Sequence, residues 1–108
     1  VVNNSPEEAK DKINKGHKYI LDVRSFSERS NGYVTNSKHI ALQDLPQKLS
    51  SLNKEDIFMV YCAGGYRSMI ACSILLSNGF NNIINIEEGY VKLLNQDINI
   101  TEGQSCLN

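Results

Sequence analysis

The sequence predicts one α/β domain with a mostly parallel sheet and helices on both faces. Apolar strand-like runs alternate with helix-like segments along the chain, which is the pattern of strands joined by crossover helices. One run, residues 57–61, is continuously apolar, as expected for a strand that is covered on both faces. The length of 108 residues suits a single domain with a modest core.

The N-terminal half opens with a strong signal for the start of a helix. Ser5 can cap the helix, Pro6 suits its first position, and Glu8 completes a capping box. Gly16 is expected to end this helix. The pattern then predicts a strand, a short helical segment, a very short strand and a helix with Pro46 in its first turn, over residues 18–23, 25–31, 39–41 and 42–52.

The C-terminal half contains the longest apolar segments. The pattern predicts a strand, a helix, a second strand and a short helix over residues 57–61, 68–77, 82–86 and 90–95. The helix over 68–77 is apolar nearly all round, so we expect it to be largely buried. Residues 96–108 are polar and expected to be irregular. We therefore expect a domain over residues 1–95 and a C-terminal tail over residues 96–108.

Composition excludes several classes of partner. The net charge of −1 gives no reason to expect nucleic acid or an anionic membrane as a partner. No C-x-x-C pair occurs and the two histidines lie far apart, so neither a metal nor another cofactor is expected. Three irregularly spaced cysteines favour a reducing compartment, and we expect the cytoplasm. The missing initiator Met leads us to expect a processed form or a domain of a longer protein.

Cys62 is the strongest candidate for a chemically active residue. It lies between a predicted strand end and a predicted helix start, where the helix dipole and free backbone N–H groups favour a nucleophilic thiolate. Gly64 and Gly65 allow the backbone to turn successive N–H groups inward, and Arg67 can close this cradle with its guanidinium. The simpler alternative is a buried structural cysteine before a glycine-rich turn.

These motifs together resemble the rhodanese (sulfurtransferase) family over roughly residues 1–95. The matching segments, in order, are LDVR at 21–24, Glu28, GYV with the following HI at 32–40, VYCAGGYRS at 60–68, NGF at 78–80 and EG at 88–89. The chain departs from the family pattern at Thr35-Asn36, where Pro-Gly is usual, and at Glu88, where Gly is common. These departures affect turns and leave the reaction class unchanged.

The resemblance implies a five-stranded, mostly parallel sheet and a reaction at sulfur. By this likeness Cys62 takes a sulfane sulfur from a donor, becomes a persulfide and passes the sulfur to a thiol or cyanide acceptor. Arg67 is the second catalytic residue implied. The implied substrate-binding residues are Ala63, Gly64, Gly65, Tyr66 and Ser68. Asp22 and Arg24 are interpreted as residues that organise the loops by hydrogen bonding.

The length and charge of the loop favour one chemistry and one class of donor. Phosphatases on the same fold use the longer spacing C-x5-R, whereas here the spacing is C-x4-R, so sulfur is favoured over phosphate or arsenate. Apart from Arg67 the loop carries no charge, which favours a larger organic persulfide such as glutathione persulfide over the small dianion thiosulfate.

Two alternatives remain for the wider context. A non-catalytic rhodanese module would serve for docking or regulation, although such modules often lose the cysteine that this chain keeps. The string CAGGYRS also resembles the rhodanese domain of bacterial persulfide dioxygenases, which implies a fused metallo-β-lactamase-fold domain as a partner. Cys72 is interpreted as a core residue and Cys106 as a bystander thiol, although Cys106 could accept sulfur from Cys62.

Overall fold

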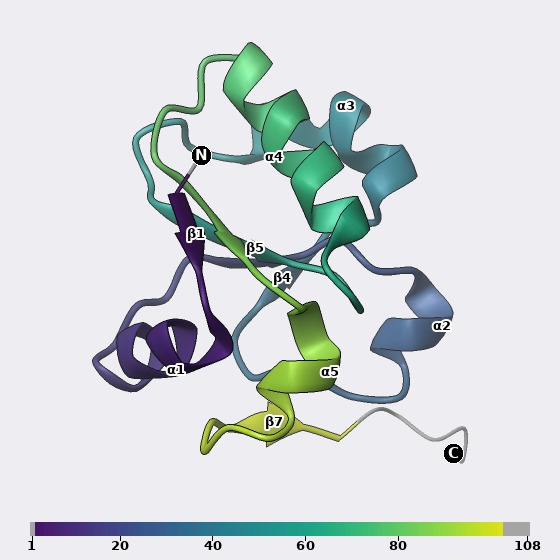
Figure 1. Ribbon diagram of the computed structural model, residues 1–108. Coiled ribbons are helices and arrows are strands. Elements are labelled where there is room, and N and C mark those ends of the chain that lie inside the picture. Colours follow the sequence, from purple (N-terminus) through teal and green to yellow (C-terminus); the bar gives the residue numbers. More distant parts are fainter. Residues whose placement is uncertain (1, 103–108) are drawn as a thin grey trace.

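The computed structural model describes residues 2–102, which form a parallel sheet of five strands (Figure 1). Its order is β1-β6-β5-β2-β4, with bounds Val2–Asn4, Ile83–Ile86, Phe58–Tyr61, Ile20–Asp22 and Lys38–His39. Every neighbouring pair in this sheet is parallel. Two further strands, β3 (Tyr33–Val34) and β7 (Ile100–Thr101), form a separate antiparallel pair. The predicted five-stranded, mostly parallel fold is confirmed.

Helices cover both faces of the sheet, as predicted. Figure 1 shows α4 (Tyr66–Ser77) and α3 (Leu45–Lys48) on one side and α1 (Pro6–Asn14) and α5 (Gly89–Leu93) on the other. The capping box at the start of α1 is present, since Glu8 N–H donates to Ser5 Oγ and Ser5 N–H donates to the Glu8 carboxylate. The short helix α2 (Phe26–Arg29) begins with a second capping box, between Ser25 and Glu28.

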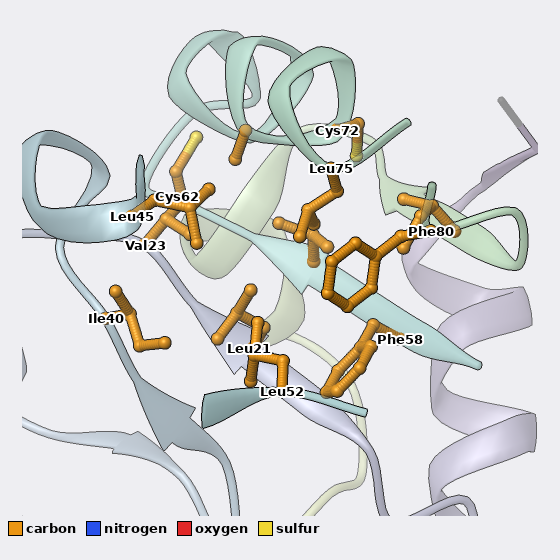
Figure 2. Packing of buried hydrophobic residues seen from close by; sticks show 13 residues of the cluster. Leu21, Val23, Ile40, Leu45, Leu52, Phe58, Cys62, Cys72, Leu75 and Phe80 are labelled. Carbon is orange, nitrogen blue, oxygen red and sulfur yellow. The ribbon is translucent and has the colours of Figure 1, made fainter. Parts of the chain in front are cut away.

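The sheet separates two hydrophobic cores because successive side chains of a strand point to opposite faces. In β5, Phe58 and Val60 face the cluster under α3 and α4, whereas Met59 and Tyr61 face the cluster under α1 and α5. Figure 2 shows the first cluster, in which Phe58, Leu75 and Phe80 pack between the sheet and α4. Burial on both faces explains the unbroken apolar run of this strand.

The prediction that the helix after the loop is largely buried was wrong. Met69 and Ile70 on α4 are 59% and 54% exposed, while Ala71, Cys72 and Leu75 are buried. A helix that covers one face of a sheet buries only one stripe of its surface, so the apolar residues on the other side meet solvent. The outer face of α4 is therefore apolar without being part of the core.

Three other elements differ from the sequence-based expectation. The polar strand β1 was not expected, and it forms because its backbone pairs with β6 at the sheet edge. Residues 42–52 form a 3-10 turn, the four-residue α3 and a second 3-10 turn, with Pro46 in the first turn of α3. The segment expected to be irregular from residue 96 contains β7, which pairs with β3.

A buried polar network lies at the carboxyl end of β2. Asp22 is fully buried and accepts hydrogen bonds from the Arg24 guanidinium at 2.9 and 3.0 Å and from the Tyr61 hydroxyl at 3.0 Å. Burial by itself would raise the pKa of Asp22, but the hydrogen bonds and charge of Arg24 outweigh it and lower that pKa. Arg29 adds a further ion pair to the same carboxylate at 3.2 Å.

The same network ties the sheet to the loops around it. The Arg24 guanidinium donates to the Gly32 carbonyl at 2.8 Å and lies 4.0 Å from the centre of the Tyr90 ring. The Tyr61 hydroxyl accepts from Val34 N–H at 3.2 Å. The predicted loop-organising residues Asp22 and Arg24 thus lie beneath the loops, at their point of attachment to the sheet.

No helix within residues 2–102 is both long enough and apolar enough to cross a membrane.

Replacing Tyr61 with Phe tests how much this network stabilises the fold. The change keeps the ring but removes the hydroxyl, which leaves Asp22 and Val34 N–H each short of one partner in a buried site. We expect the free energy of unfolding to fall by about 1–3 kcal/mol, measured by urea denaturation. Tyr19→Phe is the control, because Tyr19 is 37% exposed and its hydroxyl takes no part in this network. Equal stability of the two variants would contradict this role of Tyr61.

Candidate active site

Cys62 lies directly after β5 and before α4, as predicted from the sequence. The residue is 1% exposed, and its Sγ accepts a hydrogen bond from Gly65 N–H at 3.1 Å. Figure 2 shows its side chain at the end of the core cluster beneath α4. The sulfur therefore faces one backbone donor of the loop, the kind of group that stabilises a sulfur anion.

The loop keeps this shape through Gly65 and Ser68. Gly65 has φ of 106°, a left-handed conformation that other residues rarely adopt, and it directs its N–H toward the sulfur. Ser68 is fully buried, and its hydroxyl donates to the Gly65 carbonyl at 3.1 Å. Ser68, predicted to bind substrate, is thus placed behind the loop, where it supports Gly65.

The first residues of α5 hold the loop from the opposite side. Tyr90 N–H donates to the Cys62 carbonyl at 2.7 Å, and Val91 N–H donates to the Ala63 carbonyl at 3.2 Å. A Cβ atom on Gly89 would overlap both carbonyl oxygens, so only glycine permits this approach. Sequence reasoning noted Glu88-Gly89 as a family landmark but did not find this contact. The signal was a glycine three positions after the end of a predicted strand and directly before a predicted short helix.

Arg67 forms a two-pronged ion pair with Glu28 of α2. Its Nη1 and Nη2 donate to the two carboxylate oxygens of Glu28 at 2.7 and 2.8 Å. The hydrogen bond from Arg67 lowers the pKa of Glu28 to about 2, and the same hydrogen bond raises the pKa of Arg67. Arg67 makes no hydrogen bond to the Cys62 loop among the described residues, so its visible role is to anchor the start of α4 to α2.

A groove opens beside the loop. Its volume is about 410 Å³, and it is lined by Asn3, Gly64, Gly65, Tyr66, Met69, Asn85, Glu87 and Glu88. Tyr66, implied by the family resemblance to bind substrate, is 84% exposed and lines the groove. Asn3, Asn85 and Glu87 were not predicted as site residues from the sequence. They lie far from the loop along the chain, and only the fold brings them beside it.

Cys72 is as buried as Cys62, but it lies within α4, and no backbone N–H of a described residue donates to its sulfur. Burial raises the pKa of its thiol to about 12, which supports the interpretation as a core residue. Cys106 lies outside the described residues. Within residues 2–102 no group of His, Cys, Asp and Glu side chains could hold a metal ion.

The Glu28–Arg67 pair should make a small, pH-dependent contribution to stability. Because its pKa falls from 4.5 to about 2 on folding, Glu28 stabilises the fold above pH 4.5 and loses this effect as the pH drops toward 2. Both side chains are about one-third exposed, which limits the effect to roughly 0.5–1 kcal/mol. Glu28→Gln, which keeps the capping box, should lower urea stability at neutral pH and match the wild type near pH 2. An equal loss of stability near pH 2, or the same loss at neutral pH in the control Glu55→Gln, would contradict a stabilising Glu28–Arg67 pair.

A pair of glycine variants tests the contact between α5 and the loop. Gly89→Ala should lower the free energy of unfolding by about 2 kcal/mol or more, because its Cβ has no room beside the loop carbonyls. Gly64→Ala should stay within about 0.5 kcal/mol of the wild type, because a Cβ there meets nothing within 4 Å. Urea denaturation measures both, and a tolerated Gly89→Ala would show that the loop does not need this close approach.

Comparisons with known proteins agree with this geometry. A family model described as a rhodanese-like domain matches residues 5–96. The putative sulfurtransferase YtwF of Bacillus subtilis is 35% identical over 71 residues, covering 66% of this chain and 68% of that protein. The thiosulfate sulfurtransferase GlpE of Stutzerimonas stutzeri is 27% identical over 85 residues, covering 79% and 77%. A solved rhodanese-like domain protein from Staphylococcus aureus has a TM-score of 0.83 at 31% identity, covering 94% of this chain and 100% of that one. The chain therefore belongs to the rhodanese-like domain family.

Proposed function

We propose that this chain is a sulfurtransferase in which Cys62 carries the transferred sulfur as a persulfide. The observation that carries the proposal is the position of Cys62 Sγ, which lies inside the loop and accepts the Gly65 N–H at 3.1 Å. Only four residues separate Cys62 from Arg67, so the loop is short. Membership of the family and the names of two relatives, YtwF and GlpE, support the same class of reaction.

The reaction needs two displacements at sulfur and no cofactor. In the first, the Cys62 thiolate attacks the outer sulfur of a donor persulfide, R–S–SH. A Cys62–sulfur bond forms, the donor S–S bond breaks, and R–S⁻ leaves with the electron pair. In the second, a thiol or cyanide attacks the terminal sulfur of the Cys62 persulfide, which restores the thiolate. Each step moves one neutral sulfur atom, so no outside oxidant or reductant is consumed.

The loop would stabilise the charged persulfide through backbone donors. The proposed donors are the N–H groups of residues 63–67, of which Gly65 N–H already meets the sulfur. Arg67 contributes by holding the loop against α2 through Glu28, and Asp22 and Arg24 contribute by supporting the base of the site. Tyr66, on the rim, is the proposed contact to the body of the substrate.

An organic persulfide such as glutathione persulfide is the proposed donor, in preference to thiosulfate. A small dianion gains most from free positive charge near the sulfur. The one cation of the loop, Arg67, is already bound by the Glu28 carboxylate, so little positive charge is left for a dianion. We further propose that the reaction takes place in the cytoplasm, where thiols stay reduced.

The fusion to a metallo-β-lactamase-fold domain stays a prediction that rests on the loop string alone. Such a fusion would place a reaction that consumes persulfides next to this domain. One chain would then both transfer and consume persulfide sulfur. Reading the gene that encodes this chain tests it directly, because an adjoining domain of that fold would be visible in the open reading frame.

Intact-mass measurement tests the proposed function. After incubation with glutathione persulfide or thiosulfate, we expect a gain of about 32 Da, one sulfur atom, that disappears on adding cyanide. Cys62→Ser should gain nothing. Cys72→Ala is the matched control and should gain the same mass as the wild type, because Cys72 lies within α4, outside the loop, and burial raises the pKa of its thiol to about 12.

Two other outcomes would each replace the proposal. If no donor adds mass to Cys62 in the folded protein, the chain is a docking or regulatory module. If the protein turns over a phosphate ester in a Cys62-dependent reaction, it is a phosphatase on the same fold.

A further inference from the structure

We propose that the groove beside the Cys62 loop binds the body of an amine-bearing organic persulfide, with the ammonium group recognised by Glu87, Glu88 and Asn85. The inference rests on the proposed sulfurtransferase function and names the class of donor. It makes these three residues determinants of donor specificity, outside the loop that carries the sulfur.

The groove begins where the sulfur is held. Gly64 and Gly65 line it, and Gly65 N–H donates to Cys62 Sγ at 3.1 Å. On the other side of Gly65, a Cβ atom would lie only 3.3 Å from the Glu88 backbone nitrogen. Glu88 is therefore in immediate contact with the loop, and a donor whose outer sulfur reaches Cys62 has this groove beside it for its remaining atoms.

The charge of the groove is negative. Its lining includes two exposed glutamates, Glu87 and Glu88, but no lysine, arginine or histidine. Neither carboxylate forms an ion pair with any residue in the part of the chain that the structure describes. A site of this sign attracts a cation and repels a dianion such as thiosulfate.

Asn85 gives independent support, because this residue lines the groove and its buried side-chain oxygen is not hydrogen-bonded to any described residue. It is 3% exposed and lines the groove, and its Nδ2 donates to Asn3 Oδ1 at 3.1 Å. Its Oδ1, however, accepts no hydrogen bond from any residue within 2–102. Buried carbonyl oxygens usually have a donor, and an N–H group of a ligand would be one. An ammonium group can donate to this oxygen and pair with a carboxylate at the same time.

The rest of the lining suits the carbon skeleton of such a donor. Tyr66 and Met69, on the outer face of α4, are 84% and 59% exposed and form an apolar wall. The face of a tyrosine ring also attracts cations. A volume of about 410 Å³ falls in the range of small-molecule sites and can hold a thiol the size of a short peptide. The groove therefore fits amino-acid or peptide persulfides with a free amino group.

The test compares two donors that differ only in the amine, glutathione persulfide and N-acetylglutathione persulfide. Thiocyanate formation from cyanide gives kcat/KM for each donor. The wild type should prefer the free amine, and the double variant Glu87→Gln, Glu88→Gln should lower that preference roughly three- to tenfold. The same double variant should raise kcat/KM for thiosulfate by roughly two- to fivefold. Asn85→Leu should lower the preference in the same direction.

Matched controls remove the same groups elsewhere. Glu7→Gln with Glu55→Gln makes the same change in net charge on α1 and before β5, at residues that do not line the groove. Asn4→Leu removes another buried asparagine with an unpaired oxygen, on the adjacent strand β1 but outside the groove lining. Both controls should keep the wild-type preference between the two donors.

The outcomes separate this inference from the proposed function. Because the readout is a ratio of two donors on one protein, partial loss of folded protein cancels. Equal preference in the wild type and in the Glu87, Glu88 double variant would overturn the ammonium site while Cys62 chemistry stands. If thiocyanate formation is independent of Cys62 for every donor tested, the proposed function itself is overturned.

Discussion

The structure of the loop after Cys62 depends on two hydrogen bonds from the start of α5 to the carbonyls of Cys62 and Ala63. In a trans peptide the C=O and the following N–H point in opposite directions. By binding the carbonyls of Cys62 and Ala63, Tyr90 and Val91 turn the next N–H groups, those of Ala63 and Gly64, away from α5. A helix of five residues thus orients the first two peptide groups of the loop, and Gly89 makes this possible by leaving room for the two oxygens.

This contact is supported in turn by the buried polar network under the sheet end. The Arg24 guanidinium lies between Asp22, which it binds by hydrogen bonds, and the Tyr90 ring, 4.0 Å away. The Tyr90 ring also stacks on Tyr61, with ring centres 5.9 Å apart. The charged group is fully engaged, so its burial is compensated, and its position fixes the residue that binds the Cys62 carbonyl. Residues without contact to the sulfur therefore determine the geometry around it.

Local signals in the sequence predicted much of the fold and the centre of the site. The capping box at Ser5 and Glu8, the apolar run of β5 and the glycines after Cys62 act over a few residues, so they are visible without a structure. The partner of Arg67 was not predicted, because Glu28 lies 39 positions away and only the fold brings the two together. The strand β1 was missed because backbone pairing, and not its polar side chains, makes it a strand. The groove joins residues 3, 64–66, 69, 85, 87 and 88, which no local pattern connects.

The backbone of Glu88 ties the stability of this protein to the charge of its groove. Glu88 has φ of 60°, the left-handed conformation in which a residue other than glycine costs about 1 kcal/mol. A carboxylate is thus kept beside the loop at a position where glycine would relax the chain. One substitution to glycine would remove the strain and the charge in the same event. Under the proposed function, a substitution selected for stability at this residue would therefore also change the charge that a donor meets beside the loop.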